Sequence, residues 1–161
     1  MEAWGIPWEA VEGIGMGVPG PVSRDGTVLK CVNLGWEERK LPEEMRRYFP
    51  SLLRFEVGND VNVATLGEMW KGSASGHNSA VMITLGTGVG GGVVIQNTMF
   101  HGAFESAGEL GHICVRPEEE ETCRCGGHGC LEQYVSATGL LHQTKKALAR
   151  GRSLFFRAGK T

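Results

Sequence analysis

The chain has 161 residues, of which 41% are hydrophobic and 21% are charged, a composition typical of a globular protein rather than a disordered one. The formal net charge of −2 and the pI of about 6.2 predict no basic surface for nucleic acid or for an acidic membrane. No apolar run is long enough to span a membrane, and the N-terminus lacks the regions of a signal peptide. We therefore expect a cytoplasmic chain, in which disulfides are rare.

The hydrophobic pattern alternates between segments typical of strands and of helices. In chain order it predicts a helical turn at residues 6–13, a buried strand ending at a turn at 11–20, and a turn followed by a strand at 23–32. A helix at 40–49, a strand at 51–57 and a helix at 59–70 are predicted next. Residues 79–97 are then predicted to form a buried strand, a glycine loop and a second strand, and residues 99–111 an irregular segment. A short strand is predicted at 112–117 and a helix at 131–149, with a break near Thr138-Gly139. Strands that alternate with helices predict the α/β class.

Glycines are concentrated in a loop at residues 86–92. The segment Gly86–Gly91 has the letters G-x-G-x-x-G, but a dinucleotide-binding turn needs a helix after these glycines. The β-branched residues that follow predict a strand, so a hairpin is the better interpretation. Its backbone N–H groups and the Thr87 hydroxyl are suited to phosphate oxygens. A tight hairpin without a ligand explains the loop equally well.

Asn59 and Asp60 stand where a predicted strand meets a predicted helix. In open α/β sheets the carboxyl ends of strands line the ligand crevice. An aspartate there can accept the proton of a substrate hydroxyl during phosphoryl transfer. The alternative is a simple helix N-cap, for which both residue types are favoured.

Three of the five cysteines, Cys123, Cys125 and Cys130, fall within eight residues. Their C-x-C spacing favours metal chelation over a C-x-x-C redox pair, and a structural zinc site needs a fourth ligand. His112 and Cys114 are both candidates for it, because a strand would place them on one face. We expect His128, inside the cysteine segment, to be exposed. The acidic run at residues 118–121 is interpreted as a solvated loop.

Six motifs occur together and in one order, and they resemble the ROK family of sugar kinases and sugar-responsive repressors. They are GIGMGVPGPV, VNLGW, NDVNVATLGE, TLGTGVGGG, AGELGH and CRCGGHGCLE, between about Trp8 and about Arg150. Within the family they are most similar to the motifs of bacterial glucokinases. The resemblance implies an α/β, actin-like (ribonuclease H-like) ATPase fold with a zinc-binding loop. Members often carry Glu where this chain has Gly58.

The resemblance also implies a role for each site residue. Asp60 is expected to be the catalytic base, and the sugar contacts are expected to be Asn59, Glu109, His112 and Glu132. The expected phosphate contacts are Gly86, Thr87 and Gly88. The expected ligands of a structural zinc ion are His112, Cys123, Cys125 and Cys130. ATP and Mg²⁺ are the expected cofactors besides Zn²⁺.

Family kinases are about twice as long and begin with a D-x-G-G-T phosphate motif that this sequence lacks. We therefore expect an incomplete fold in residues 1–161, with residues 1–57 the remainder of an N-terminal lobe and residues 58–161 part of a C-terminal lobe that carries the zinc motif. We expect the adenosine-binding part to be absent from this segment as well. This chain is expected to have little or no kinase activity by itself.

The function implied for an intact member is ATP-dependent phosphorylation of glucose to glucose 6-phosphate. The alternatives are an N-acetylmannosamine or fructose kinase, the effector domain of a sugar-sensing repressor, and a non-catalytic, zinc-stabilised sugar-binding module. Polyphosphate is an alternative donor to ATP. The expected partners are therefore a hexose and ATP, without nucleic acid or membrane, and an intact member can form a homodimer.

Overall fold

The computed structural model describes residues 5, 7, 10–31, 34–49 and 54–152, which form two compact units. The first unit contains the described residues up to 82 together with 92–108, and the second contains 83–91 and the described residues from 109 onward. The helical turn predicted at residues 6–13 falls partly outside the described residues.

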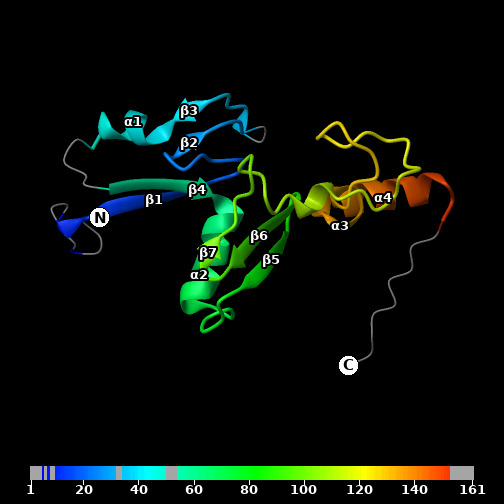
Figure 1. Ribbon diagram of the computed structural model, residues 1–161. Coiled ribbons are helices and arrows are strands. Elements are labelled where there is room, and N and C mark those ends of the chain that lie inside the picture. The colour runs from blue at the N-terminus through cyan, green and yellow to red at the C-terminus, as the bar shows by residue number, and fades with distance from the viewer. Residues whose placement is uncertain (1–4, 6, 8–9, 32–33, 50–53, 153–161) are drawn as a thin grey trace. The chain divides into compact units, whose positions relative to one another are not determined.

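A parallel pair of strands is the centre of the first unit (Figure 1). Strand β1 (Gly13–Val18) pairs with β4 (Arg54–Asn59), so that Val18 lies opposite Asn59 at their carboxyl ends. Helix α2 (Asp60–Lys71) begins at the residue that follows β4. Both strands and the helix were predicted from the sequence, and the structure confirms them over the described residues. The predicted burial of the first strand is wrong, because Gly13, Gly15 and Gly17 of β1 are exposed.

The connection from β1 to β4 supplies most of the apolar core of this unit. It contains the antiparallel pair β2 (Thr27–Val28) and β3 (Arg39–Lys40), followed by helix α1 (Leu41–Arg46). The predicted turn before β2 is confirmed, because Asp25 Oδ1 accepts a hydrogen bond of 3.2 Å from the Thr27 amide and Gly26 has φ +82°. The buried cluster that these elements form consists of Val18, Val22, Val28, Cys31 and Leu41.

A three-stranded sheet follows, with the order β5-β6-β7. Its strands are β5 (Ala80–Leu85), β6 (Val89–Ile95) and β7 (Thr98–Met99), and the division between the two units passes through β5 and β6. The predicted hairpin is confirmed, but the predicted burial of the first strand is wrong. Burial alternates along β5, so only one face of the strand is covered. Residues on the opposite face are 58–66% exposed, namely Val81, Ile83 and Leu85.

The second unit has short helical elements and loops. They are the 3₁₀ turn η4 (Leu110–His112), helix α3 (Glu132–Val135) and helix α4 (Ala137–Ala149). The strand predicted at 112–117 is wrong: η4 occupies its start, and Cys114 makes only an isolated bridge to Cys130. The predicted helix break lies at Ser136, two residues before Thr138, because the Ser136 hydroxyl caps α4 by accepting a hydrogen bond from the Gly139 amide.

The predicted lobe boundary after residue 57 lies inside β4, whereas the two compact units divide elsewhere along the chain. The assignment of the two ranges to lobes of a larger protein stays a prediction. Across the part of the chain that the structure describes, no helix is long and apolar enough to cross a membrane.

Gly58 leaves space for a side chain of the following helix. A Cβ atom at this position would lie 2.8 Å from Val63 Cγ2. We expect Gly58→Glu to lower the free energy of unfolding by about 1 kcal/mol, because the β-branched Val63 side chain cannot easily rotate away. Val63→Ala in the same chain should restore the loss, as chemical denaturation would show.

Gly67→Glu is the matched control for this pair, because a Cβ atom at Gly67 meets nothing within 4 Å. This substitution should stabilise α2 slightly, since glutamate is a better helix former than glycine. Equal stability of Gly58→Glu with and without Val63→Ala would contradict the steric explanation.

Candidate functional site

Asn59 caps helix α2, as the capping alternative predicted. Its Oδ1 atom accepts hydrogen bonds of 3.0 and 3.1 Å from the amides of Val61 and Asn62. Its Nδ2 atom donates to the Gly20 carbonyl oxygen at 3.1 Å, which ties the helix start to the turn after β1. A primary amide has two N–H groups, so the second stays available for a ligand. The sugar-binding role of Asn59 stays a prediction.

Asp60 presents an exposed carboxylate at the first position of α2, beside the carboxyl ends of β1 and β4. Oδ1 accepts a hydrogen bond of 2.9 Å from the Val61 amide. The two strands approach it closely because β1 has a glycine there: a Cβ atom at Gly17 would lie 3.3 Å from Asp60 Cα. This is where a parallel sheet places groups that act on a bound ligand.

In the structure the glycine loop is the hairpin turn formed by Gly86, Thr87 and Gly88, which lies in the second unit and contacts the start of α3. Glu132 Oε2 accepts a hydrogen bond of 3.0 Å from the Val89 amide, just after the loop. A Cβ atom at Gly88 would collide with the same carboxylate oxygen. The predicted sugar contact Glu132 and the predicted phosphate contact Gly88 are therefore neighbours, and the absence of a side chain at Gly88 permits this approach.

The three clustered cysteines and His112 converge on one point. All four ligand atoms lie within 4.8 Å of one another. The Cys125 and Cys130 sulfur atoms are 3.6 Å apart, and His112 Nδ1 is 3.8 Å from Cys123 Sγ. A tetrahedral zinc ion with Zn–S bonds of about 2.3 Å separates its ligands by about 3.8 Å. The spacing and the donor types therefore fit a Cys₃His metal site.

Local backbone structure explains which of the two candidate fourth ligands joins this cluster. The turn η4 carries His112 to the cysteines and leaves Cys114 exposed and outside the group of four. His112 Nε2 lies 3.8 Å from Glu109 Oε2, so the two ring nitrogens face the cluster and a carboxylate, respectively. Such a carboxylate orients a ligating imidazole. His128 is exposed, as predicted.

The thiols of the cluster differ in their acidity. Burial, together with the neighbouring thiols, raises the pKa of Cys130 to about 12. The Gly127 backbone N–H lowers the pKa of Cys125. Without a cation, Cys130 therefore keeps its proton at neutral pH, whereas a divalent metal replaces the proton of a coordinating thiol.

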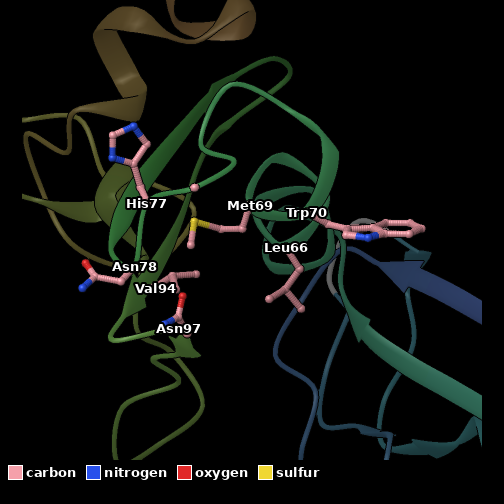
Figure 2. A pocket seen from close by; sticks show the side chains of 8 residues that line it. Leu66, Met69, Trp70, His77, Asn78, Val94 and Asn97 are labelled. Carbon is pink, nitrogen blue, oxygen red and sulfur yellow. The ribbon is translucent and has the colours of Figure 1, made fainter.

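A separate pocket of about 400 Å³ lies in the first unit (Figure 2). It lies between the C-terminal half of α2, the loop that follows α2 and the β6–β7 hairpin. It is lined by Leu66, Met69, Trp70, Gly76, His77, Asn78, Val94 and Asn97. Met69 points toward His77, Asn78 and Val94, whereas Trp70 projects away from them. None of the predicted site residues lines this pocket, since Asp60 is about 9 Å along the helix axis from Leu66.

Comparison with known proteins decides the family. The model of the ROK family matches residues 7–160. The chain belongs to the ROK family. The resemblance given by the six motifs is thereby confirmed.

Curated ROK relatives include both enzymes and regulators. The chain is 46% identical over 129 residues to a glucokinase of Halalkalibacterium halodurans, covering 80% of this chain and 38% of that protein. It is 35% identical over 144 residues to a xylose repressor of Caldicellulosiruptor bescii, covering 89% of this chain and 35% of that protein. The chain thus spans less than half the length of these relatives.

Among solved ROK structures, the glucokinase of Streptomyces griseus, in complex with glucose and AMPPNP, is 39% identical. It superposes with a TM-score of 0.74 over 88% of this chain and 45% of that one. A ROK transcriptional regulator, a homologue of the Escherichia coli MLC protein, is 29% identical, with a TM-score of 0.78 over 89% of this chain and 36% of that one. These likenesses support the predicted α/β, actin-like ATPase fold.

In the acidic run of this ROK chain, Glu118 and Glu120 are exposed, as the predicted solvated loop requires, but Glu119 and Glu121 are half-buried and make specific contacts. Glu119 accepts a hydrogen bond of 2.8 Å from the Tyr134 hydroxyl. Glu121 contacts Lys146 at 2.8 Å and His142 at 2.6 Å. The run therefore ties the cysteine segment to α3 and α4. Sequence reasoning missed these residues because no local spacing connects the acidic run with a helix that begins more than ten residues later.

These contacts predict a pH dependence of stability. The Tyr134 hydroxyl lowers the pKa of Glu119, and Lys146 lowers the pKa of Glu121, below the ordinary value of 4.5. The stabilisation should be complete above that ordinary value and should be lost as the pH falls through the lower folded-state values. We expect Glu119→Gln/Glu121→Gln to destabilise the chain at neutral pH, and by less at about pH 3, as measured by denaturant unfolding.

Glu120→Gln is the matched control, because Glu120 is exposed between the two network residues. It should leave the free energy of unfolding nearly unchanged at both pH values. A double variant whose effect is the same at neutral and at acidic pH would contradict the ionic role of the network.

Proposed function

We propose that this chain carries the sugar site and part of the phosphate site of an ATP-dependent hexose kinase. The observation that carries the proposal is the exposed Asp60 carboxylate at the carboxyl end of parallel strand β4, directly before α2. Relatives named as glucokinases add support, and glucose is therefore the first substrate to test.

In this proposal Asp60 takes the proton from the attacking sugar hydroxyl. Asn59, Glu109, His112 and Glu132 are the proposed contacts of the sugar. Backbone N–H groups of the loop formed by Gly86, Thr87 and Gly88 face negative charge on the transferred phosphoryl group. Bound Mg²⁺ would neutralise further phosphate charge. Because the reaction needs little covalent chemistry from the protein, positioning is the main contribution of these residues.

The Cys₃His cluster is proposed as a structural zinc site formed by His112, Cys123, Cys125 and Cys130. Its four protein ligands leave no open position, which distinguishes it from a catalytic zinc site. Zinc would fix the η4 turn to the cysteine segment. It would thereby orient two proposed sugar contacts: His112 itself, and Glu132, which follows Cys130 by two residues.

A second candidate function is sugar sensing without catalysis. Xylose repressors at 35% and 32% identity among the relatives favour it. Both candidates predict sugar binding, but only a kinase needs Asp60 as a base. Calorimetry with glucose in the absence of ATP tests sugar binding, and N-acetylmannosamine and fructose are the other sugars to compare. The choice between ATP and polyphosphate, the homodimer and the cytoplasmic location stay predictions.

A chimera tests the kinase proposal. The segment of the Halalkalibacterium halodurans glucokinase that aligns with this chain is replaced by this chain's own residues. We expect the chimera to phosphorylate glucose with ATP. Asp60→Asn should lower its kcat by at least about 100-fold with little change in glucose affinity, because the proton acceptor is lost while the sugar contacts remain. A coupled assay of glucose 6-phosphate formation measures both effects.

Glu12→Gln is the matched control, because it also replaces an exposed carboxylate of the same unit by an amide. It should leave the chimera active. Substantial turnover by the Asp60→Asn chimera would remove Asp60 from its proposed role. A folded chimera that binds glucose but does not phosphorylate it would favour the sensing function.

Elemental analysis of the purified chain tests the zinc proposal. We expect about one zinc ion per chain. Cys123→Ser, Cys125→Ser and Cys130→Ser should each lose it, and Cys114→Ser should keep it because that thiol lies outside the cluster. A chain that is fully folded without metal would contradict the structural role.

A further inference from the structure

The N-terminus of α4 holds the glycine loop by its carbonyl oxygens. The Ala137 amide donates to the Gly86 carbonyl oxygen at 2.9 Å. The Thr138 hydroxyl donates to the Thr87 carbonyl oxygen at 2.8 Å. The first amides of a helix have no partner inside the helix, so the loop satisfies one of them. These contacts lie within the second unit and join segments about 50 residues apart in the chain.

Planar peptide groups convert these contacts into a defined orientation of the loop. In a trans peptide the C=O and N–H bonds point in opposite directions. The Gly86 carbonyl shares a peptide group with the Thr87 N–H, and the Thr87 carbonyl shares one with the Gly88 N–H. With both carbonyls turned toward α4, both N–H groups point away from it. Neither donates a hydrogen bond to a described residue.

The junction that carries these donors is tightly packed. Ser136 is fully buried, and its hydroxyl donates to the Glu132 carbonyl oxygen at 2.7 Å while capping α4. A Cβ atom at Gly139 would lie 2.6 Å from that same carbonyl oxygen, so only glycine allows the first turn of α4 to lie against α3. Ser136 and Gly139, on either side of Thr138, are therefore fixed by packing, whereas the Thr138 side chain itself is exposed.

We propose that Thr138 is a positioning residue that, together with the Ala137 amide, aims the Thr87 and Gly88 N–H groups at the phosphate groups of the donor. The phosphate part of this inference rests on the proposed kinase function. The positioning part rests only on the contacts to Gly86 and Thr87.

Hydrogen exchange of single amides, followed by NMR on the purified chain, tests the positioning. Gly86, Val89 and Ala137 have amides whose hydrogen bonds depend on the loop geometry, with partners Gly88 O, Glu132 Oε2 and Gly86 O. Thr138→Val removes one hydrogen bond, so exchange at these three amides should become about fivefold faster. Thr138→Ser keeps the hydroxyl and should restore the wild-type rates.

Two controls separate local loosening of the loop from general instability. Thr144→Val makes the same substitution six residues further along α4, where the threonine side chain has no hydrogen bond to a described residue. It should leave the exchange rates of the three amides unchanged. The Cys123 amide, which donates to Gly127 O at 2.7 Å, should keep its exchange rate in every variant. Unchanged exchange in Thr138→Val, no rescue by Thr138→Ser, or an equal effect of Thr144→Val would each overturn the proposal.

The wild-type chain supplies a test that does not depend on the folding of a variant. The Ala137 amide must exchange more slowly than an unprotected amide, and exchange at the unprotected rate would overturn the proposal. Titration with Mg²⁺-tripolyphosphate should then shift the Thr87 and Gly88 amide resonances in the wild type and less so in Thr138→Val. Protected amides without a tripolyphosphate response would contradict the phosphate role alone.

Discussion

The second unit depends on polar and sulfur contacts because it buries very little apolar side chain. Of the described residues in this unit, the buried hydrophobic ones are Val89, Cys123 and Cys130. Small proteins with so little apolar core usually need a metal or disulfides for stability. The convergence of four ligand atoms within 4.8 Å is therefore the main constraint on this region. The acidic residues that contact Tyr134 and Lys146 hold the same segment by further hydrogen bonds and ion pairs.

This constraint extends along the chain from the metal cluster to the glycine loop. Cys130 belongs to the cluster, Glu132 accepts the Val89 amide, Ser136 caps α4, and Thr138 contacts the loop carbonyl. Nine consecutive residues thus connect the proposed zinc site, sugar contact and phosphate loop. A change in metal occupancy should therefore be felt on the phosphate side as well as on the sugar side of the reaction.

The sequence predicted what depends on neighbours along the chain. The strand-to-helix junction at Asn59, the hairpin around the glycine loop and three of the four cluster ligands all follow from local spacing. The β-branched residues Ile113 and Val115 wrongly predicted a strand, because the backbone there pairs with Gly129 and Leu131 through only a few hydrogen bonds. Contacts between distant segments, such as Thr138 with Thr87, have no signature in one sequence.

The fit of Gly58 against Val63 has a consequence for how this family diversifies. A side chain at position 58 and a branched side chain at position 63 compete for one space, because a Cβ atom at position 58 would lie 2.8 Å from Val63 Cγ2. In this chain a side chain at position 58 is accommodated more easily once the side chain at position 63 has become smaller. The order of the two changes therefore matters for stability, because gaining the side chain at position 58 first costs about 1 kcal/mol.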